Sequence, residues 1–210
     1  MGWTSYHATY YAKNGNIDRK AECDAYFMEG LNRGHYRVEK STLVDSVYYA
    51  AVRILKRVAK DDSGQYIRLA DNQYLYEDIP VEEQKVFGTV FLTSVNNNDY
   101  YNFSYKDMDE SMGPCYYDCP ESILKLLSPT DSEYALNWRA SCREQTSAKK
   151  RLNAAPIGTA IHFFLSGKEV QLVKRAPSYQ FKKPGWYNPA NNTYMRQYQI
   201  PINFTVQNEQ

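Results

Sequence analysis

A chain of 210 residues is long enough for one domain with a small appendage, and its 20 tyrosines favour β structure. It contains no run of 18 apolar residues and no basic segment followed by an apolar one at its start, so we expect neither a membrane span nor a secretion signal. The net charge of +1 hides two opposite regions: residues 1–148 carry 16 Lys and Arg against 22 Asp and Glu, and residues 149–210 carry 9 against 2. We therefore expect a cytoplasmic protein with no membrane partner and with a basic C-terminal part.

Aromatic and β-branched residues alternate with turn signals in the first 58 residues. The aromatic segment 1–11 predicts a strand, and Asp18 is placed to cap a helix over residues 18–31. Residues 36–44 and 47–58 predict two further strands. The second of these could also form a helix, since its alanines and arginines permit one, but it leads towards a clear hairpin and we interpret it as a strand.

The polar, turn-rich segment 59–85 predicts a long excursion from the sheet, with a small hairpin inside it. No internal repeat is apparent. Residues 86–95 then alternate with a period of two, Asn96 to Asp99 supply a turn, and a second aromatic strand begins at Tyr101. This unit is the clearest antiparallel hairpin in the chain.

Two helices are predicted after the hairpin, near residues 120–128 and 131–148. Turn sequences then separate short strands at 158–165, 169–173 and 194–206. We expect an α+β fold, in which two or three helices cover an antiparallel meander of four or five strands. Residues 1–148 would form this core domain, and residues 149–210 a small, basic, barrel-like β module packed on it.

One C-terminal segment interleaves cations with aromatic rings. Cations can follow a nucleic-acid backbone while flat rings stack on bases, so this pattern is typical of a single-stranded nucleic-acid surface. It also suits docking on an acidic protein, including the acidic part of a second copy of this chain. The candidate binding residues are Lys174, Arg175, Tyr179, Phe181, Lys182, Lys183, Trp186 and Tyr187.

Metal and cofactor motifs are not found in the sequence. Cys115 and Cys119 are separated by three residues, which is not the spacing of a zinc finger or ribbon, and the four cysteines are expected to be free thiols. The acidic run around Asp107 lacks the glycine position of a calcium loop. We expect neither a metal nor a cofactor, and we expect the acidic residues between Asp99 and Glu133 to form a charged rim.

The N-terminal segment Tyr6-His7-Ala8-Thr9 resembles the Tyr-His-Gly-Thr opening strand of the ADP-ribosyltransferases, with Ala8 in place of the glycine. The resemblance implies an NAD-using enzyme in which His7 binds the ribose and Tyr48, or Tyr49, stacks on nicotinamide. Glu110 would then be the catalytic glutamate. An NAD-using enzyme is therefore the alternative hypothesis to a binding protein.

Three stretches together are similar to a family of small proteins encoded by bacteriophages and conjugative elements of gut bacteria. They are the opening GWTSYHATYY, the centre containing YKDMDE and the loop APSYQFKKPGWY. The resemblance implies an accessory protein of a mobile element, acting in the cytoplasm of a bacterial host. We expect a non-enzymatic protein that binds nucleic acid or a host nucleoprotein complex, with inhibition of a host defence protein by its acidic face as a variant.

Overall fold

The computed structural model describes residues 4–6, 11–31, 34–94, 103–179 and 184–207. The chain forms two compact units, Met1–Cys142 and Arg143–Gln210. The expected division after residue 148 lies in the helix that supplies residues to both units. The units have opposite charge: residues 1–142 carry 15 Lys and Arg against 21 Asp and Glu, and residues 143–210 carry 10 against 3.

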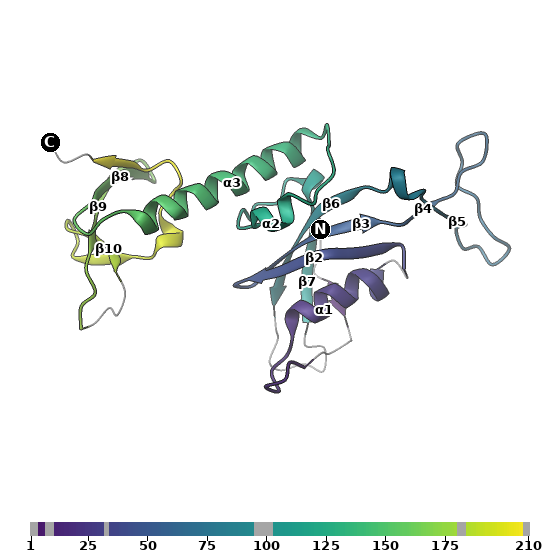
Figure 1. Ribbon diagram of the computed structural model, residues 1–210, viewed down its shortest axis with the longest axis horizontal. Coiled ribbons are helices and arrows are strands. Elements are labelled where there is room, and N and C mark those ends of the chain that lie inside the picture. Colours follow the sequence, from purple (N-terminus) through teal and green to yellow (C-terminus); the bar gives the residue numbers. More distant parts are fainter. Residues whose placement is uncertain (1–3, 7–10, 32–33, 95–102, 180–183, 208–210) are drawn as a thin grey trace. The chain divides into compact units, whose positions relative to one another are not determined.

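The first unit is built on a five-stranded antiparallel sheet, which confirms the α+β prediction (Figure 1). Its strands are β1 (Thr4–Tyr6), β2 (Tyr36–Val44), β3 (Val47–Ile54), β6 (Val86–Ser94) and β7 (Phe103–Asp109). They lie in the order β1-β7-β6-β3-β2. Four of them form the predicted meander, and β1 pairs with the free edge of β7. The predicted turn at residues 96–99 lies outside the described residues.

Strand β3 is buried on both faces, so its alternating side chains enter two separate cores. On one face, Tyr49 and Ala51 pack with Trp138 and with the short helix α2 (Glu121–Leu124). On the other, Tyr48, Ala50 and Val52 pack with Cys23, Tyr26, Phe27 and Phe91. Because both faces are covered, the strand has no polar side. Its sequence therefore lacks the alternation of polar and apolar residues that identifies a strand, and this is why its alanine-rich sequence also permitted a helix.

The helices follow the predicted positions with different ends. Asp18 caps α1 (Arg19–Ala25) by accepting a hydrogen bond from the Ala21 amide at 3.0 Å, as expected, and the chain continues as a π-helical segment, Tyr26–Leu31. The helix predicted near 120–128 is only the single turn α2. The helix predicted for 131–148 is α3 (Glu133–Ala154), which continues past its predicted end through the basic residues 149–151.

Gly88 allows α3 to approach the first sheet closely. A Cβ atom at this position would lie 2.8 Å from Cζ3 of Trp138 and 3.2 Å from Cδ1 of Leu127, inside contact distance. The indole of Trp138 is 2% exposed and donates a hydrogen bond to the Tyr116 carbonyl at 2.9 Å. The early turns of α3 are therefore fixed against β6, next to one end of the sheet.

The segment between β3 and β6 forms a projecting arm of hairpins (Figure 1). Its stem is the pair β4 (Lys56–Val58) and β5 (Tyr76–Asp78). Beyond the stem lie two consecutive hairpins of equal length and similar structure, Ala59–Tyr66 (AKDDSGQY) and Ile67–Tyr74 (IRLADNQY). These are an internal repeat, which the sequence analysis missed because only the final Gln-Tyr is identical in the two copies.

Both copies of the repeat use the same local interactions. The cation at the second position lies over the tyrosine ring at the last one, with Lys60 Nζ 5.2 Å and Arg68 Cζ 4.8 Å from the ring centroids. The sixth position has positive φ in each copy. Three main-chain hydrogen bonds join the hairpins and stem in a closed triangle: Ala59 donates to Leu75, Leu75 to Ile67 and Ile67 to Ala59, at 2.8–3.0 Å.

The second unit contains another five-stranded antiparallel sheet, ordered β11-β10-β9-β8-β12. Its strands are β8 (Ala160–Leu165), β9 (Lys168–Arg175), β10 (Gly185–Asn188), β11 (Thr193–Met195) and β12 (Thr205–Gln207). Because β11 and β12 lie at opposite edges, this is an open sheet and the predicted barrel-like closure is wrong. Its core contains Ala148 and Leu152 from the last turns of α3, together with residues from one face of the sheet.

Candidate functional site

The predicted binding residues of the second unit belong to two different faces of its sheet. Lys174 pairs with Trp186 across β9 and β10, while their neighbours Arg175 and Tyr187 occupy the alternate positions. Successive side chains in a strand point to opposite faces, so this run of residues cannot form one surface. Lys174 and Trp186 face the core, and Arg175 and Tyr187 face away from it.

Lys174 has a structural role at the end of α3. Its side chain is buried, and its ammonium group donates hydrogen bonds to the carbonyls of Leu152, Asn153 and Ala155 at 3.0, 2.8 and 2.7 Å. The last carbonyls of a helix have no partners within the helix, and a cation there also interacts favourably with the helix dipole. The ammonium lies 5.9 Å from the ring centroid of Trp186, whose side chain is 3% exposed. Neither Lys174 nor Trp186 is therefore available to contact a ligand, and both are excluded from the candidate site.

Arg175, Tyr179 and Tyr187 are the predicted residues that remain on the surface side. The Arg175 guanidinium lies 3.3 Å from the centroid of the Tyr187 ring, so it covers that ring and leaves it 8% exposed. Tyr179 is fully exposed. Phe181, Lys182 and Lys183 lie outside the described residues.

We define the outer face of the second sheet as the side opposite the core, on which Arg175 and Tyr187 lie. Cross-strand pairing places His162, Phe164 and Tyr194 on the same face. The Phe164 ring is 69% exposed, and the Tyr187 and Tyr194 rings meet edge to face at 5.3 Å between centroids. This face therefore presents aromatic rings, one stacked guanidinium and the Glu169 carboxylate, which lies 3.4 Å from the His162 ring, within a unit whose net charge is +7.

The residues of the enzymatic alternative are not assembled into one site among the described residues. Tyr48 is fully buried between α1 and the first sheet, where its ring stacks on Phe91 at 5.2 Å and its hydroxyl donates to Asp24 at 2.6 Å. Burial raises the pKa of the Tyr48 hydroxyl well above its ordinary value. Tyr49, on the other face, is 1% exposed. Neither ring can stack on nicotinamide, because a central strand covered on both sides has no open position. His7 lies outside the described residues.

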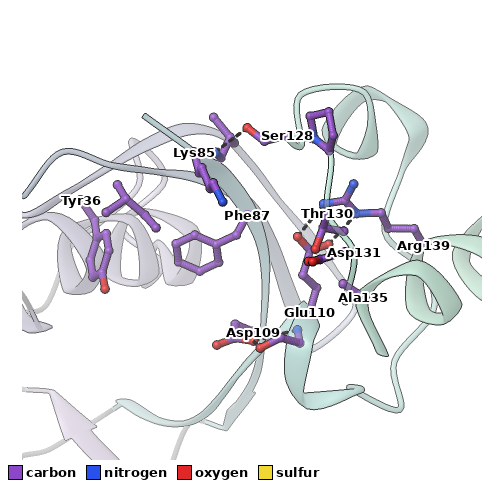
Figure 2. A pocket seen from close by; sticks show the side chains of 14 residues that line it. Tyr36, Lys85, Phe87, Asp109, Glu110, Ser128, Thr130, Asp131, Ala135 and Arg139 are labelled. Atoms are coloured by element: carbon purple, nitrogen blue, oxygen red, sulfur yellow. Dashed lines mark hydrogen bonds and ion pairs between the residues drawn. The ribbon is translucent and has the colours of Figure 1, made fainter. Parts of the chain in front are cut away.

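Glu110, the third of these residues, lines a cleft at one end of the first sheet (Figure 2). It begins a short 3₁₀ turn, Glu110–Met112, directly after β7, and its carboxylate is 4% exposed. Arg139 on α3 donates to both carboxylate oxygens, from Nε and Nη2, each at 2.7 Å. This two-pronged ion pair fixes the end of β7 against the helix.

The cleft has a volume of about 620 Å³ and lies where several segments of the first unit converge. The beginning of β2 contributes Tyr36 and the beginning of β6 contributes Phe87, so one wall is aromatic. The opposite wall consists of the end of β7, the loop before α3 and the helix itself, and Figure 2 shows the ion pair on this side. The complete lining is Tyr36, Ile54, Lys85, Val86, Phe87, Asp109, Glu110, Ser111, Ser128, Pro129, Thr130, Asp131, Ala135 and Arg139.

Hydrogen bonds hold the two walls of the cleft together. The Ser128 hydroxyl accepts a hydrogen bond from the Val86 amide at 2.9 Å, and the Ser128 amide donates to the Val86 carbonyl at 2.9 Å. The Asp109 carboxylate accepts from the amide and the hydroxyl of Ser111. Burial, together with the charge of Asp109, raises the pKa of the Tyr36 hydroxyl, which is therefore a hydrogen-bond donor at neutral pH.

Sequence reasoning selected Glu110 but not its partner or its cleft. The two charged residues are 29 positions apart, and nothing in the local pattern of either one indicates the contact. The available signal was an arginine at position 139, directly after Trp138 and close to Ala135 and Cys142 on the same helix, where a charged side chain that becomes buried needs a partner.

The chain was compared with protein-family models, curated proteins and solved structures, and none of them matches it. Among the described residues, no group of three or more His, Cys, Asp or Glu side chains is arranged to hold a metal ion. In the same part of the chain, none of the helices has the length and apolar character needed to cross a bilayer.

Proposed function

We propose that this chain is a non-enzymatic binding protein whose second unit binds single-stranded nucleic acid on its outer face, as an accessory protein of a mobile genetic element. The proposal rests on one observation: the second unit has a high net positive charge and also presents aromatic rings on its outer face. The unit from Arg143 to Gln210 has a net charge of +7, and the outer face of its sheet presents Phe164 and the stacked pair Arg175–Tyr187.

The chemistry of this face fits an unpaired strand better than a duplex. Bases of a single strand can stack on exposed rings, and each such contact contributes about 1–3 kcal/mol without depending on sequence. Phe164 offers an exposed ring on this face, Tyr179 offers another in the loop after β9, and Arg175 offers a cation over the Tyr187 ring. Cations elsewhere on the unit attract the phosphates over a longer distance.

The proposal is tested by fluorescence anisotropy of labelled oligonucleotides, single-stranded and duplex, titrated with the full chain at several salt concentrations. We expect tighter binding of the single strand and an affinity that falls steeply with salt. Arg175→Ala and Tyr179→Ala should each weaken binding about five- to tenfold, the effect of one lost stacking contact.

Matched controls come from exposed residues of the first unit. Lys125→Ala and Tyr134→Ala remove a cation and a 66%-exposed ring there and should leave the affinity unchanged. Absence of any shift with either oligonucleotide, or an affinity that does not respond to salt, would rule the proposal out. In that case, capture from host extract with and without nuclease tests the nucleoprotein complex as the target.

A further inference from the structure

The cleft at the end of the first sheet combines three kinds of chemical group in one cavity. Tyr36 and Phe87 form an aromatic wall, Lys85 and Arg139 supply positive charge, and Asp109 and Asp131 supply carboxylate oxygens. Its volume of about 620 Å³ is within the range of roughly 300–1,000 Å³ that is typical of small-molecule sites. This cleft belongs to the first unit and does not depend on the outer face of the second.

Arg139 lines the cleft and has one guanidinium nitrogen that Glu110 does not use. Glu110 occupies Nε and Nη2, and Figure 2 shows the remaining nitrogen, Nη1, pointing away from Glu110. Arg139 is 9% exposed and Glu110 4%, so the pair is largely removed from water. A buried ion pair is often no more stabilising than apolar residues of the same size, so stability alone does not account for a charged pair in the wall of a cavity.

Lys85 supplies the second cation from the opposite side. Its carbonyl accepts a hydrogen bond from the Ile54 amide at 2.9 Å, which fixes the main chain beside the cleft, while its side chain remains exposed. The side chain has no ion-pair partner among the described residues. Two cations approaching from two walls suit an anionic group such as a phosphate.

The carboxylates indicate that the ligand also carries hydrogen-bond donors. Ser111 occupies one oxygen of Asp109, and Asp131 is an exposed residue of the loop before α3. Hydroxyl or amino groups of a ligand can donate to such oxygens, whereas a second anionic group would be repelled by them.

We infer that this cleft binds a mononucleotide. In this arrangement the base lies against Tyr36 and Phe87, the phosphate meets Lys85 and Nη1 of Arg139, and the sugar hydroxyls or base amino groups donate to Asp109 and Asp131. A nucleotide is a ligand class that uses an aromatic wall, a pair of cations and carboxylate acceptors together.

The test is isothermal titration calorimetry of the full chain with the four ribonucleoside monophosphates. We expect saturable binding of at least one of them, weaker binding of the matching nucleoside and weaker binding of inorganic phosphate. Lys85→Gln and Phe87→Leu should each reduce the affinity about tenfold, the effect of losing one charge-assisted hydrogen bond or stacking contact. Thermal melting confirms that each variant is folded.

Two control variants separate this site from other binding. Lys125→Gln and Lys13→Gln each remove an exposed lysine that does not line the cleft, and both should leave nucleotide affinity unchanged. Benzylamine, an aromatic cation, tests the opposite charge preference. Tighter binding of benzylamine, no binding of any monophosphate at millimolar concentration, or unchanged affinity in Lys85→Gln would each overturn the inference.

Discussion

The two sheets of this protein have the same number of strands but differ in how many faces they bury. In the first, β3 has five consecutive buried residues, Tyr48–Val52, because helices cover both faces. In the second, buried and more exposed residues alternate along β8, because helix and loop residues cover one face. The difference locates the candidate sites: the doubly covered sheet offers a cleft at its end, and the singly covered sheet offers a whole face.

The largest effect is expected in the buried ion pair of the first unit. Arg139→Met leaves the Glu110 carboxylate buried without a partner and should lower the free energy of unfolding by about 3–5 kcal/mol. Urea unfolding followed by tryptophan fluorescence measures this loss. Adding Glu110→Leu to the same chain should restore most of it. A loss below about 1 kcal/mol in the single variant would mean that the pair is well hydrated.

A smaller effect is expected where the second unit uses a buried cation. Lys174→Met removes the donor to three carbonyls at the end of α3 and directly after it, and should cost about 1–3 kcal/mol. Its neighbour on the outer face provides the matched control: Arg175→Met should change stability by no more than about 0.5 kcal/mol. Equal losses in the two variants would contradict the assignment of these residues to opposite faces.

Alanine substitutions at two glycines compare a covered face of the first sheet with the outer face of the second sheet. Gly88→Ala forces a methyl group against Trp138 and Leu127 in a closed core and should cost about 1–3 kcal/mol. Gly185→Ala brings a methyl group to 2.9 Å from Cδ1 of Tyr194, but this ring lies on the outer face, is only partly buried and is not part of the core. We therefore expect a loss below about 1 kcal/mol, and chemical denaturation of both variants ranks them.

The smallest expected effect is a pH dependence at the stem of the arm. Burial, reinforced by Lys56, lowers the pKa of His35 below its ordinary value of 6.5, and its ring lies 3.9 Å from that of Tyr76. The unfolded chain then holds this proton more tightly, so the folded state loses stability as the pH falls through 6.5 towards the lower folded-state pKa. An NMR titration of the ring protons measures the shift, and His35→Gln should weaken the pH dependence.

Short-range patterns predicted the elements of this fold, and long-range contacts limited the prediction of its sites. The period of two identified β6, and Asp18 identified the start of α1, because each signal is contained within a few neighbouring residues. The contact between Glu110 and Arg139 joins separate elements and has no such signal. Lys174 and Trp186 were assigned to a surface because charge and aromaticity were counted along the chain, whereas the pleat of β9 and β10 places adjacent residues on opposite sides.

The arm gives the protein a place where its sequence can change without altering the rest. Each of its two hairpins is closed by local interactions, and the triangle that joins them uses main-chain atoms of Ala59, Ile67 and Leu75 alone. Side chains at the tips therefore take no part in that junction, and substitution of an exposed tip residue such as Asp62 should leave the junction intact. The arm thereby serves as an attachment point for labels in the binding experiments.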